Sequence, residues 1–162
     1  MRPGELTAAY SCPDCGTGPD VDHGRPGYVL DSGPARLPLS LSRSCGWALL
    51  AAGPVGAAAA VGVDLEQSSG AGFPGFDDVA LTPTERQRLA ALAPGDATPW
   101  RAAAWARKEA LLKARGTGLR IDPASVEAFA ELPDGTVLID LDTAALGLPA
   151  GFAAALSIVG TA

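Results

Sequence analysis

Residues 105–113 constrain the fold most, because they read as the middle of one helix that carries charge where a core helix would not. A helical wheel places four apolar residues on one arc, namely Ala104, Trp105, Leu111 and Leu112. Lys108 falls inside that arc, and Glu109 and Lys113 stand at its edge, one turn apart. Since an unpaired ammonium among apolar groups is costly, we expect the helix to point two cations and a carboxylate into a shared polar pocket. The alternative is that Lys108 extends to water and that Glu109 and Lys113 form a surface pair.

Residues 61–66 predict the end of a buried strand that carries two carboxylates on one face. Because strand side chains alternate, the apolar residues point into the core while Gly62, Asp64 and Glu66 point the other way. Carboxylates about 7 Å apart repel each other unless a cation lies between them, and hard oxygen ligands suit Mg²⁺ or Mn²⁺. Gly62 is expected to leave room for a ligand beside the backbone. An ordinary solvent-facing strand end is the alternative.

Length and charge exclude several classes of protein. The chain has 162 residues, 48% of them hydrophobic and 19% charged, which predicts one globular domain with a real core. A formal net charge of -6 argues against a general nucleic-acid or anionic-membrane binder. The longest apolar run, residues 47–63, is interrupted by glycine and proline and is short for a bilayer span, so we expect two buried strands and a turn there. The first ten residues do not form a signal peptide.

The cysteines leave two interpretations open. Cys12 and Cys15 form a CxxC motif, and His23, the only histidine, follows. Together they could make part of a zinc site in a small interaction domain, but the remaining Cys45 is far along the chain. We favour a turn with two reduced thiols, and an odd, low number of cysteines predicts a cytoplasmic protein.

Helix and strand signals follow in a mixed order. Thr82, Pro83 and Glu85 form a capping box for a helix that runs to about residue 93, and Glu85 has either this role or a role in a site. The main helix is predicted over 99–115, after a break at 94–96, with Gly116 as its stop. Strands are predicted over residues 28–30, 35–42, 47–52, 58–65, 126–132, 137–141 and 152–159.

Three segments in this order resemble a known family. They are Gly62-Val-Asp-Leu-Glu66, Leu81-Thr-Pro-Thr-Glu85 and Trp105-Ala-Arg-Lys-Glu-Ala-Leu-Leu-Lys113, followed by Gly116, Gly118 and Leu119. The pattern is similar to that of the 4'-phosphopantetheinyl transferases, specifically the larger pseudo-dimeric, surfactin-synthetase-activating type. Residues 24–26 and 41–44 are weaker matches, and the resemblance covers about residues 12–160.

The resemblance implies an α+β fold and a transfer reaction. It implies one domain over 1–162 with two pseudo-repeated halves, about 1–60 and 61–162, and a ligand cleft between them. It also implies Mg²⁺-dependent transfer of 4'-phosphopantetheine from coenzyme A to a serine of an apo-acyl or peptidyl carrier protein, releasing 3',5'-ADP, in secondary metabolite biosynthesis. No nucleic acid or membrane partner is expected.

The resemblance also implies roles for single residues. The implied Mg²⁺ or Mn²⁺ ligands are Asp64, Glu66 and Glu109. Lys108 and Lys113 are implied to contact the phosphates of coenzyme A. The nucleotide 3'-phosphate is implied to lie at Arg25, Ser42 and Arg43. Glu109, or a metal-bound water near it, would take the serine proton, and Lys113 would assist catalysis. Arg43 stands where the family usually has a histidine, and arginine still binds phosphate.

The start of the chain departs from the family pattern. The family usually has a segment with a helix before the CxxC region, whereas this sequence begins almost at Cys12. We expect a reduced N-terminal half with uncovered apolar surface, and a monomer or weak self-association. A degenerate, non-catalytic module that binds coenzyme A or a carrier protein is the alternative to an enzyme.

Overall fold

Strands fill the first part of the chain and helices follow the seventh strand. The computed structural model describes residues 6–12, 14–18, 20–21, 24–30, 33–34, 37–54 and 59–160. Its strands are β1 (Leu6–Cys12), β2 (Gly16–Gly18), β3 (Arg25–Leu30), β4 (Gly33–Pro34), β5 (Leu39–Ser44), β6 (Trp47–Ala52), β7 (Ala59–Gln67), β8 (Thr136–Asp140) and β9 (Phe152–Gly160). Its helices are α1 (Phe76–Ala80), α2 (Pro83–Ala90) and α3 (Pro94–Ala114), with short 3₁₀ turns at Ser68–Ala71, Gly118–Arg120 and Pro123–Ser125. The α+β class is therefore confirmed. No helix in the described stretches has the length and apolarity needed to span a bilayer.

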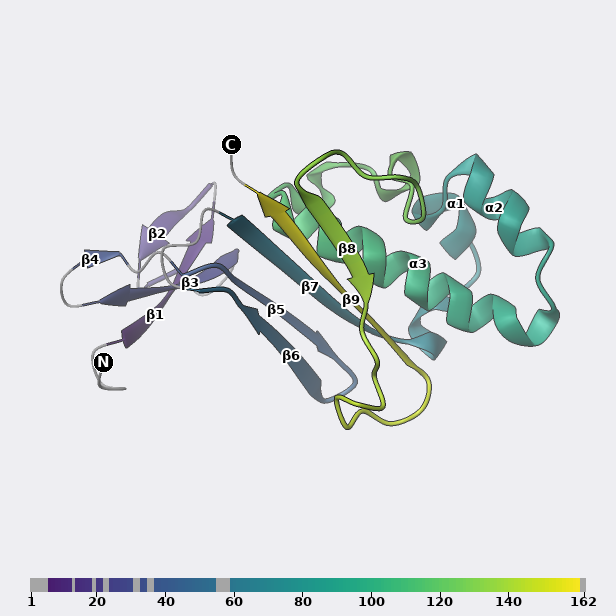
Figure 1. The fold of residues 1–162 in the computed structure, drawn as a ribbon, viewed down its shortest axis with the longest axis horizontal. Helices are drawn as coiled ribbons and strands as arrows, with labels where there is room; N and C mark the ends of the chain where they lie inside the picture. The colour runs from purple at the N-terminus through teal and green to yellow at the C-terminus, as the bar shows by residue number, and fades with distance from the viewer. Residues whose placement is uncertain are drawn as a thin grey trace.

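The strands form three sheets, with orders β2-β1-β3-β4, β5-β6 and β7-β9-β8. In Figure 1, α3 lies across one face of the β7-β9-β8 sheet, and the β5-β6 hairpin lies along β7. The β2-β1-β3-β4 sheet lies at the N-terminal end of the molecule. The strands predicted at 47–52, 137–141 and 152–159 are confirmed within a residue or so.

The two buried strands expected over 47–63 are not hydrogen-bonded to each other, because β6 pairs with β5 and β7 pairs with β9. The expected burial is wrong for β6, most of whose residues are exposed. The other edge of β7 is met by serine side chains of β5 instead of a backbone ladder. The Ser40 hydroxyl accepts the Val63 N–H at 2.9 Å, and the Ser44 hydroxyl accepts the Gln67 N–H at 3.2 Å. Serine at alternate positions of β5 thus joins the hairpin to the main sheet.

Gly62 allows α3 to approach β7 closely. A Cβ at this position would lie 1.9 Å from the Ala110 carbonyl oxygen and 2.4 Å from the Ala114 nitrogen. The space beside Gly62 is filled by helix backbone, so the expectation of room for a ligand there is wrong. The same contact places the Gly62, Asp64 and Glu66 face of β7 against α3.

We expect Gly62→Ala to lower the free energy of unfolding by about 3 kcal/mol, because overpacking forces helix and strand apart. Urea unfolding followed by circular dichroism measures this. Gly95→Ala is the matched control, since a Cβ at Gly95 meets nothing within 4 Å. Equal stability of the two variants would contradict the close packing.

The main helix begins earlier than predicted. It starts at Pro94, so the predicted break at 94–96 is wrong and the predicted start at residue 99 lies inside the helix. Proline at residue 99 removes only one helical hydrogen bond, the one to the Gly95 carbonyl. Because Gly95 is exposed, water can hydrogen-bond to that carbonyl instead. The predicted stop is confirmed: Gly116 has a φ of +70° and its N–H donates to the Lys113 carbonyl.

The strand predicted at 126–132 is absent from the structure, which has turns there. Side chains from two helices use the backbone of this segment. The Ala128 N–H donates to Glu85 Oε1 at 2.7 Å, and the Ala128 carbonyl accepts from Arg107 Nε at 2.7 Å. Because the Ala128 N–H and carbonyl bind side chains, they are not available to pair with another strand.

Some apolar surface stays uncovered on the sheets. The residues exposed by more than 40% include Trp47, Leu50, Val137 and Ile139 on β6 and β8. Uncovered apolar side chains were expected in the N-terminal part of the chain, which contains β6, and self-association stays a prediction.

Candidate active site

Asp64 is the centre of a polar cluster between β7 and α3. Its side chain is 3% exposed, and Oδ1 accepts from Lys113 Nζ at 2.6 Å and from Ser42 Oγ at 2.7 Å. Its other oxygen, Oδ2, is buried and has no hydrogen-bond partner among the described residues. A buried carboxylate oxygen without a partner is costly and points to a missing donor or cation.

Glu66 and Glu109 belong to the same cluster, as their pKa values show. Burial raises the pKa of Glu66 to about 7, and the charges of Asp64 and Glu109 add to the effect, while Lys113 and a hydrogen bond from Trp105 oppose it. Burial also raises the pKa of Glu109, followed by the charge of Asp64. Strand and helix therefore bring the three carboxylates and Lys113 together.

Apolar walls explain the desolvation of Glu66. The carboxylate lines a hollow of about 180 Å³ whose other walls include Phe73, Phe76, Val79 and Trp105. An ionised group beside such walls loses hydration, which favours the protonated form.

These oxygen donors have the chemistry that Mg²⁺ or Mn²⁺ prefers. In the described stretches, however, no group of three or more Asp, Glu, His or Cys side chains is arranged ready to hold a metal ion. The Lys113 ammonium instead neutralises Asp64. The residue types and the orphaned Asp64 Oδ2 fit a divalent cation, and the three carboxylates would have to turn toward it.

The raised pKa of Glu66 predicts how stability depends on pH. In the unfolded chain a glutamate titrates near about 4.3, whereas in the fold Glu66 titrates at about 7. Between these values the folded state holds a proton that the unfolded chain has lost, so this group makes stability fall as pH rises.

We expect Glu66→Gln to abolish that part of the pH dependence. Urea unfolding of both proteins in a chelator, from about pH 4.5 to 8, measures it. The difference between the two free energies should grow in favour of the variant as pH rises. Glu109 titrates in both proteins, so the difference reports the titration of Glu66 together with its charge interaction with Glu109. A difference that stays constant with pH would contradict the assignment.

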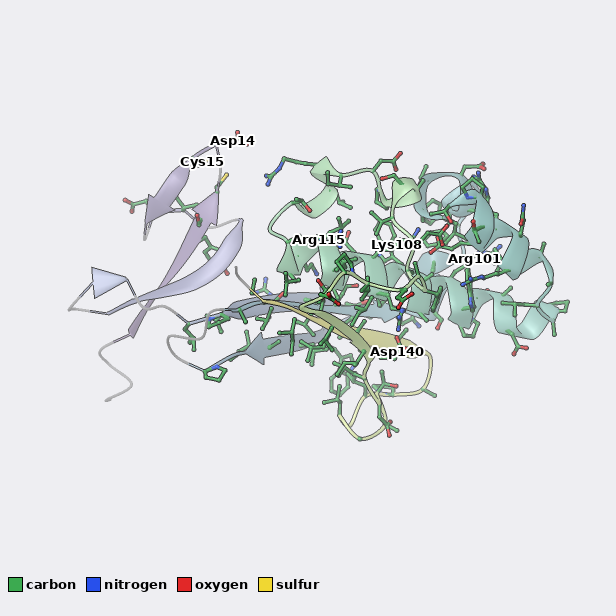
Figure 2. The ribbon with its side chains drawn as sticks, turned by 45° about the horizontal axis from the view of Figure 1, so that its top comes forward. Asp14, Cys15, Arg101, Lys108, Arg115 and Asp140 are labelled. Carbon is green, nitrogen blue, oxygen red and sulfur yellow. The ribbon has the colours of Figure 1, made fainter. Side chains whose placement is uncertain are left out.

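Lys108 is fully buried and does not line the cleft, which argues against the predicted contact with coenzyme A. The side chain is completely buried, and Nζ lies 2.5 Å from Glu85 Oε2, whose side chain is also completely buried. The ammonium also donates to the carbonyls of Ala80 and Pro123. Figure 2 shows Lys108 on the side of α3 that faces α1 and α2. Burial lowers the pKa of Lys108, while Glu85 opposes this shift.

The sequence left Glu85 either a capping role or a role in a site, and in the described structure it has the capping role. Its Oε2 accepts the Thr82 N–H at 2.9 Å, and the Thr82 hydroxyl accepts the Glu85 N–H at 3.1 Å, which completes the predicted capping box. Its other contacts are to Lys108 and Ala128. Glu85 therefore joins α2, α3 and the 122–128 segment.

A cleft of about 440 Å³ lies beside Lys113, between the N-terminal strands and the loop after α3. It is lined by Ser11, Gly24, Leu39, Ser40, Leu41, Lys113, Gly116, Thr117, Gly118 and Arg120. Lys113 thus faces both the cleft and Asp64. The carboxylate cluster and the cleft together can hold an anion at one end and a cation or proton at the other.

The other residues predicted to contact coenzyme A are not among the described residues that line this cleft. Ser42 is buried and donates to Asp64, so it orients the carboxylate. Arg43 is exposed on β5 and does not line the cleft. Arg25 opens β3 beside Gly24, a cleft residue, and its side chain lies outside the described residues.

The CxxC motif forms the turn between β1 and β2. Cys12 is buried and Cys15 is exposed, and a hydrogen bond with Cys12 is the main cause that raises the pKa of Cys15. Figure 2 shows Asp14 and Cys15 at this turn, apart from Lys108 and Arg101 on α3. No disulfide joins Cys12 and Cys15, and their reduced state stays a prediction. His23 lies outside the described residues.

A comparison with known protein families shows the family of this chain. The sequence profile of the 4'-phosphopantetheinyl transferase superfamily matches residues 60–150, more than half of the 162 residues. The chain belongs to this superfamily. The matched region runs from β7 through α3 to β8, and so contains Asp64, Glu66 and Glu109. Comparison with curated proteins finds no match.

Sequence reasoning missed several groups that shape the site of this 4'-phosphopantetheinyl transferase superfamily member. Trp105 was expected only on the apolar arc, yet its indole N–H donates a hydrogen bond to Glu66. Ser40 and Arg120 line the cleft and were not predicted. The signal for Arg120 was its place directly after the Gly116–Leu119 motif, whereas Ser40 becomes visible only once β5 is known to lie along β7.

Proposed function

We propose that this protein transfers the 4'-phosphopantetheine group from coenzyme A to a serine hydroxyl of an apo-acyl or peptidyl carrier protein and releases 3',5'-ADP. One observation carries the proposal: Lys113 lines a cleft of about 440 Å³ and pairs with the buried Asp64, whose charge also acts on Glu66 and Glu109. Membership of the superfamily supports it.

Lys113 is placed to bind the pyrophosphate of coenzyme A. Its ammonium lines the cleft and contacts Asp64, so it lies between the space for a ligand and the carboxylates. A fixed cation at this position stabilises charge that develops on phosphoryl oxygens. Ser42 keeps Asp64 oriented through its hydroxyl.

Asp64, Glu66 and Glu109 would hold Mg²⁺ or Mn²⁺. When bound, the cation would neutralise charge on the transferred and leaving phosphoryl groups. The buried Asp64 Oδ2 supports this proposal, as does the pKa of Glu66, which burial raises and the charges of Asp64 and Glu109 raise further.

Glu109 would accept the proton of the attacking serine. The serine oxygen bonds to the phosphorus that carries the pantetheine arm, the bond from this phosphorus to the bridging oxygen breaks, and 3',5'-ADP leaves. Burial raises the pKa of Glu109, which makes its carboxylate a better base than a solvated one. The position of Glu109 on α3, one turn before Lys113, and the charge interaction between the two side chains support this role.

Three further properties are proposed on the same basis. The chain forms one domain of two pseudo-repeated halves, with the cleft between the N-terminal strands and the loop after α3. It works in the cytoplasm as a monomer or weakly associating protein. Its carrier proteins serve secondary metabolite biosynthesis.

The transfer is tested by incubating the recombinant chain with coenzyme A, MgCl₂ and an apo-carrier protein. Intact mass spectrometry should show the carrier gaining one phosphopantetheine group, and a chelator should prevent the gain. Several apo-acyl and peptidyl carrier proteins should be compared. Coenzyme A binding without any mass gain would contradict the enzymatic proposal and favour a non-catalytic binding module.

A further inference from the structure

The CxxC turn brings two thiols to one end of the β2-β1-β3-β4 sheet. Strand β1 ends at Cys12, whose partner across the antiparallel pair is Gly16 on β2. Gly16 has a φ of +87°, so the chain reverses here through a backbone conformation that favours glycine. Opposite residues of an antiparallel pair have Cα atoms about 5 Å apart. Because Cys15 directly precedes Gly16, Cys12 and Cys15 lie at the same end of the hairpin.

The two side chains contact each other. A hydrogen bond joins the Cys15 thiol to Cys12, and no disulfide links them. A disulfide needs Cα atoms within about 7 Å of each other and sulfurs that can meet, and a tight turn brings the Cα atoms within that distance. The turn therefore presents two thiols within reach of each other.

The two thiols differ in their access to solvent. Cys15 is exposed at the turn, as Figure 2 shows, whereas Cys12 is buried, with an exposed fraction of 8%. The backbone at Cys12 packs closely against β3, because a Cβ at Gly24 would lie 2.4 Å from the Ser11 carbonyl oxygen and 3.0 Å from the Cys12 Cα. Ser11 and Gly24 also line the cleft, so the pair lies directly beside the cleft wall. A dissolved oxidant reaches Cys15 first, with Cys12 held next to it.

We infer that Cys12 and Cys15 form a reversible disulfide by exchange with a small disulfide such as oxidised glutathione. The Cys15 thiolate attacks one sulfur of oxidised glutathione, a mixed disulfide forms, and the first glutathione leaves as a thiolate that takes up a proton. The Cys12 thiolate then attacks Cys15 Sγ, and the second glutathione leaves in the same way. The two protein thiols lose two electrons and two protons, and oxidised glutathione becomes two reduced glutathiones.

This disulfide is a modification that the proposed transfer reaction does not use. In a reducing compartment such bonds are mostly transient and respond to a change of redox state. The hydrogen bond with Cys12 is the main cause that raises the pKa of Cys15. Its thiolate is therefore scarce at neutral pH, and the first step becomes faster as pH rises.

Intact mass spectrometry of the Cys45→Ser chain, incubated with oxidised glutathione and a chelator at about pH 8.5, tests the inference. The chain has three cysteines, so this substitution leaves only the pair. We expect a product lighter than the starting chain by about 2 Da, the mass of two hydrogens, that carries no glutathione. Excess reduced glutathione should restore the starting mass.

Two single-thiol variants in the same background test the separate roles. Cys12→Ser should keep one glutathione on Cys15, because no second thiol remains to displace it. Cys15→Ser should take up glutathione at least about tenfold more slowly than Cys12→Ser, because Cys12 is buried. In concentrated urea the two variants should react at equal rates, since burial is lost.

Three results would overturn the inference. The first is a Cys45→Ser chain that keeps glutathione without losing two hydrogens, and the second is a chain that does not react at all. The third is equal rates for Cys12→Ser and Cys15→Ser without urea. The measurement on the Cys45→Ser chain needs neither of the other substitutions, so it decides the disulfide even if Cys12→Ser fails to fold.

Discussion

Lys108→Met lowers the free energy of unfolding by about 4 kcal/mol in our expectation, because it leaves a buried carboxylate without its cation. Lys108 and Glu85 are both completely buried and lie 2.5 Å apart, so no water can replace the lost partner. Urea unfolding followed by circular dichroism measures the change. If the variant is too unstable to purify, Lys108→Arg, which keeps the charge but overfills the site, provides the measurement.

Two further variants distinguish the loss of the buried ion pair from the loss of a charged side chain in general. Arg86→Met breaks an exposed ion pair with Asp78 and should cost less than about 1 kcal/mol. The double variant Lys108→Met with Glu85→Gln should recover about half of the loss, since the uncompensated charge is gone. If Lys108→Met is as stable as Arg86→Met, Lys108 is not the structural residue described here.

Glu109→Gln should reduce phosphopantetheine transfer by about a thousandfold or more, because it removes a proposed metal ligand and base at once. Its stability should stay equal or rise slightly, since burial and Asp64 disfavour the ionised form of Glu109. Intact mass of the carrier protein over time measures transfer, and urea unfolding measures stability.

The matched control for this substitution is Glu131→Gln, at an exposed residue outside the cluster. It should transfer at the rate of the unaltered protein. Activity in Glu109→Gln close to that of Glu131→Gln would mean that the cluster does not carry the reaction. Loss of activity together with unfolding would be visible in the stability measurement.

Local patterns predicted the parts of the site that depend on local geometry. Alternation along a strand placed Gly62, Asp64 and Glu66 on one face, and helical spacing placed Glu109 and Lys113 one turn apart. The structure sets these faces against each other, with Lys113 on Asp64. The capping box at Thr82 and the helix stop at Gly116 were predictable for the same reason.

The errors concern groups whose partners come from distant parts of the chain. Lys108 looked like a ligand-binding cation because nothing nearby in the sequence shows Glu85 as its buried partner. Residues 126–132 have strand-forming composition, but Glu85 and Arg107 use the Ala128 backbone instead. The close approach of α3 made Gly62 a packing residue. Tertiary contacts override local preference in each case.

Binding of Mn²⁺ tests the central claim most directly, namely that Asp64, Glu66 and Glu109 together hold one divalent cation. Electron paramagnetic resonance of Mn²⁺ titrated into the chain, with coenzyme A present, counts bound ions without requiring a carrier protein. We predict a single saturable site that is lost in Asp64→Asn and in Glu109→Gln and is kept in Glu131→Gln. No saturable binding by the unaltered protein, or equal binding by all the variants, would contradict the claim.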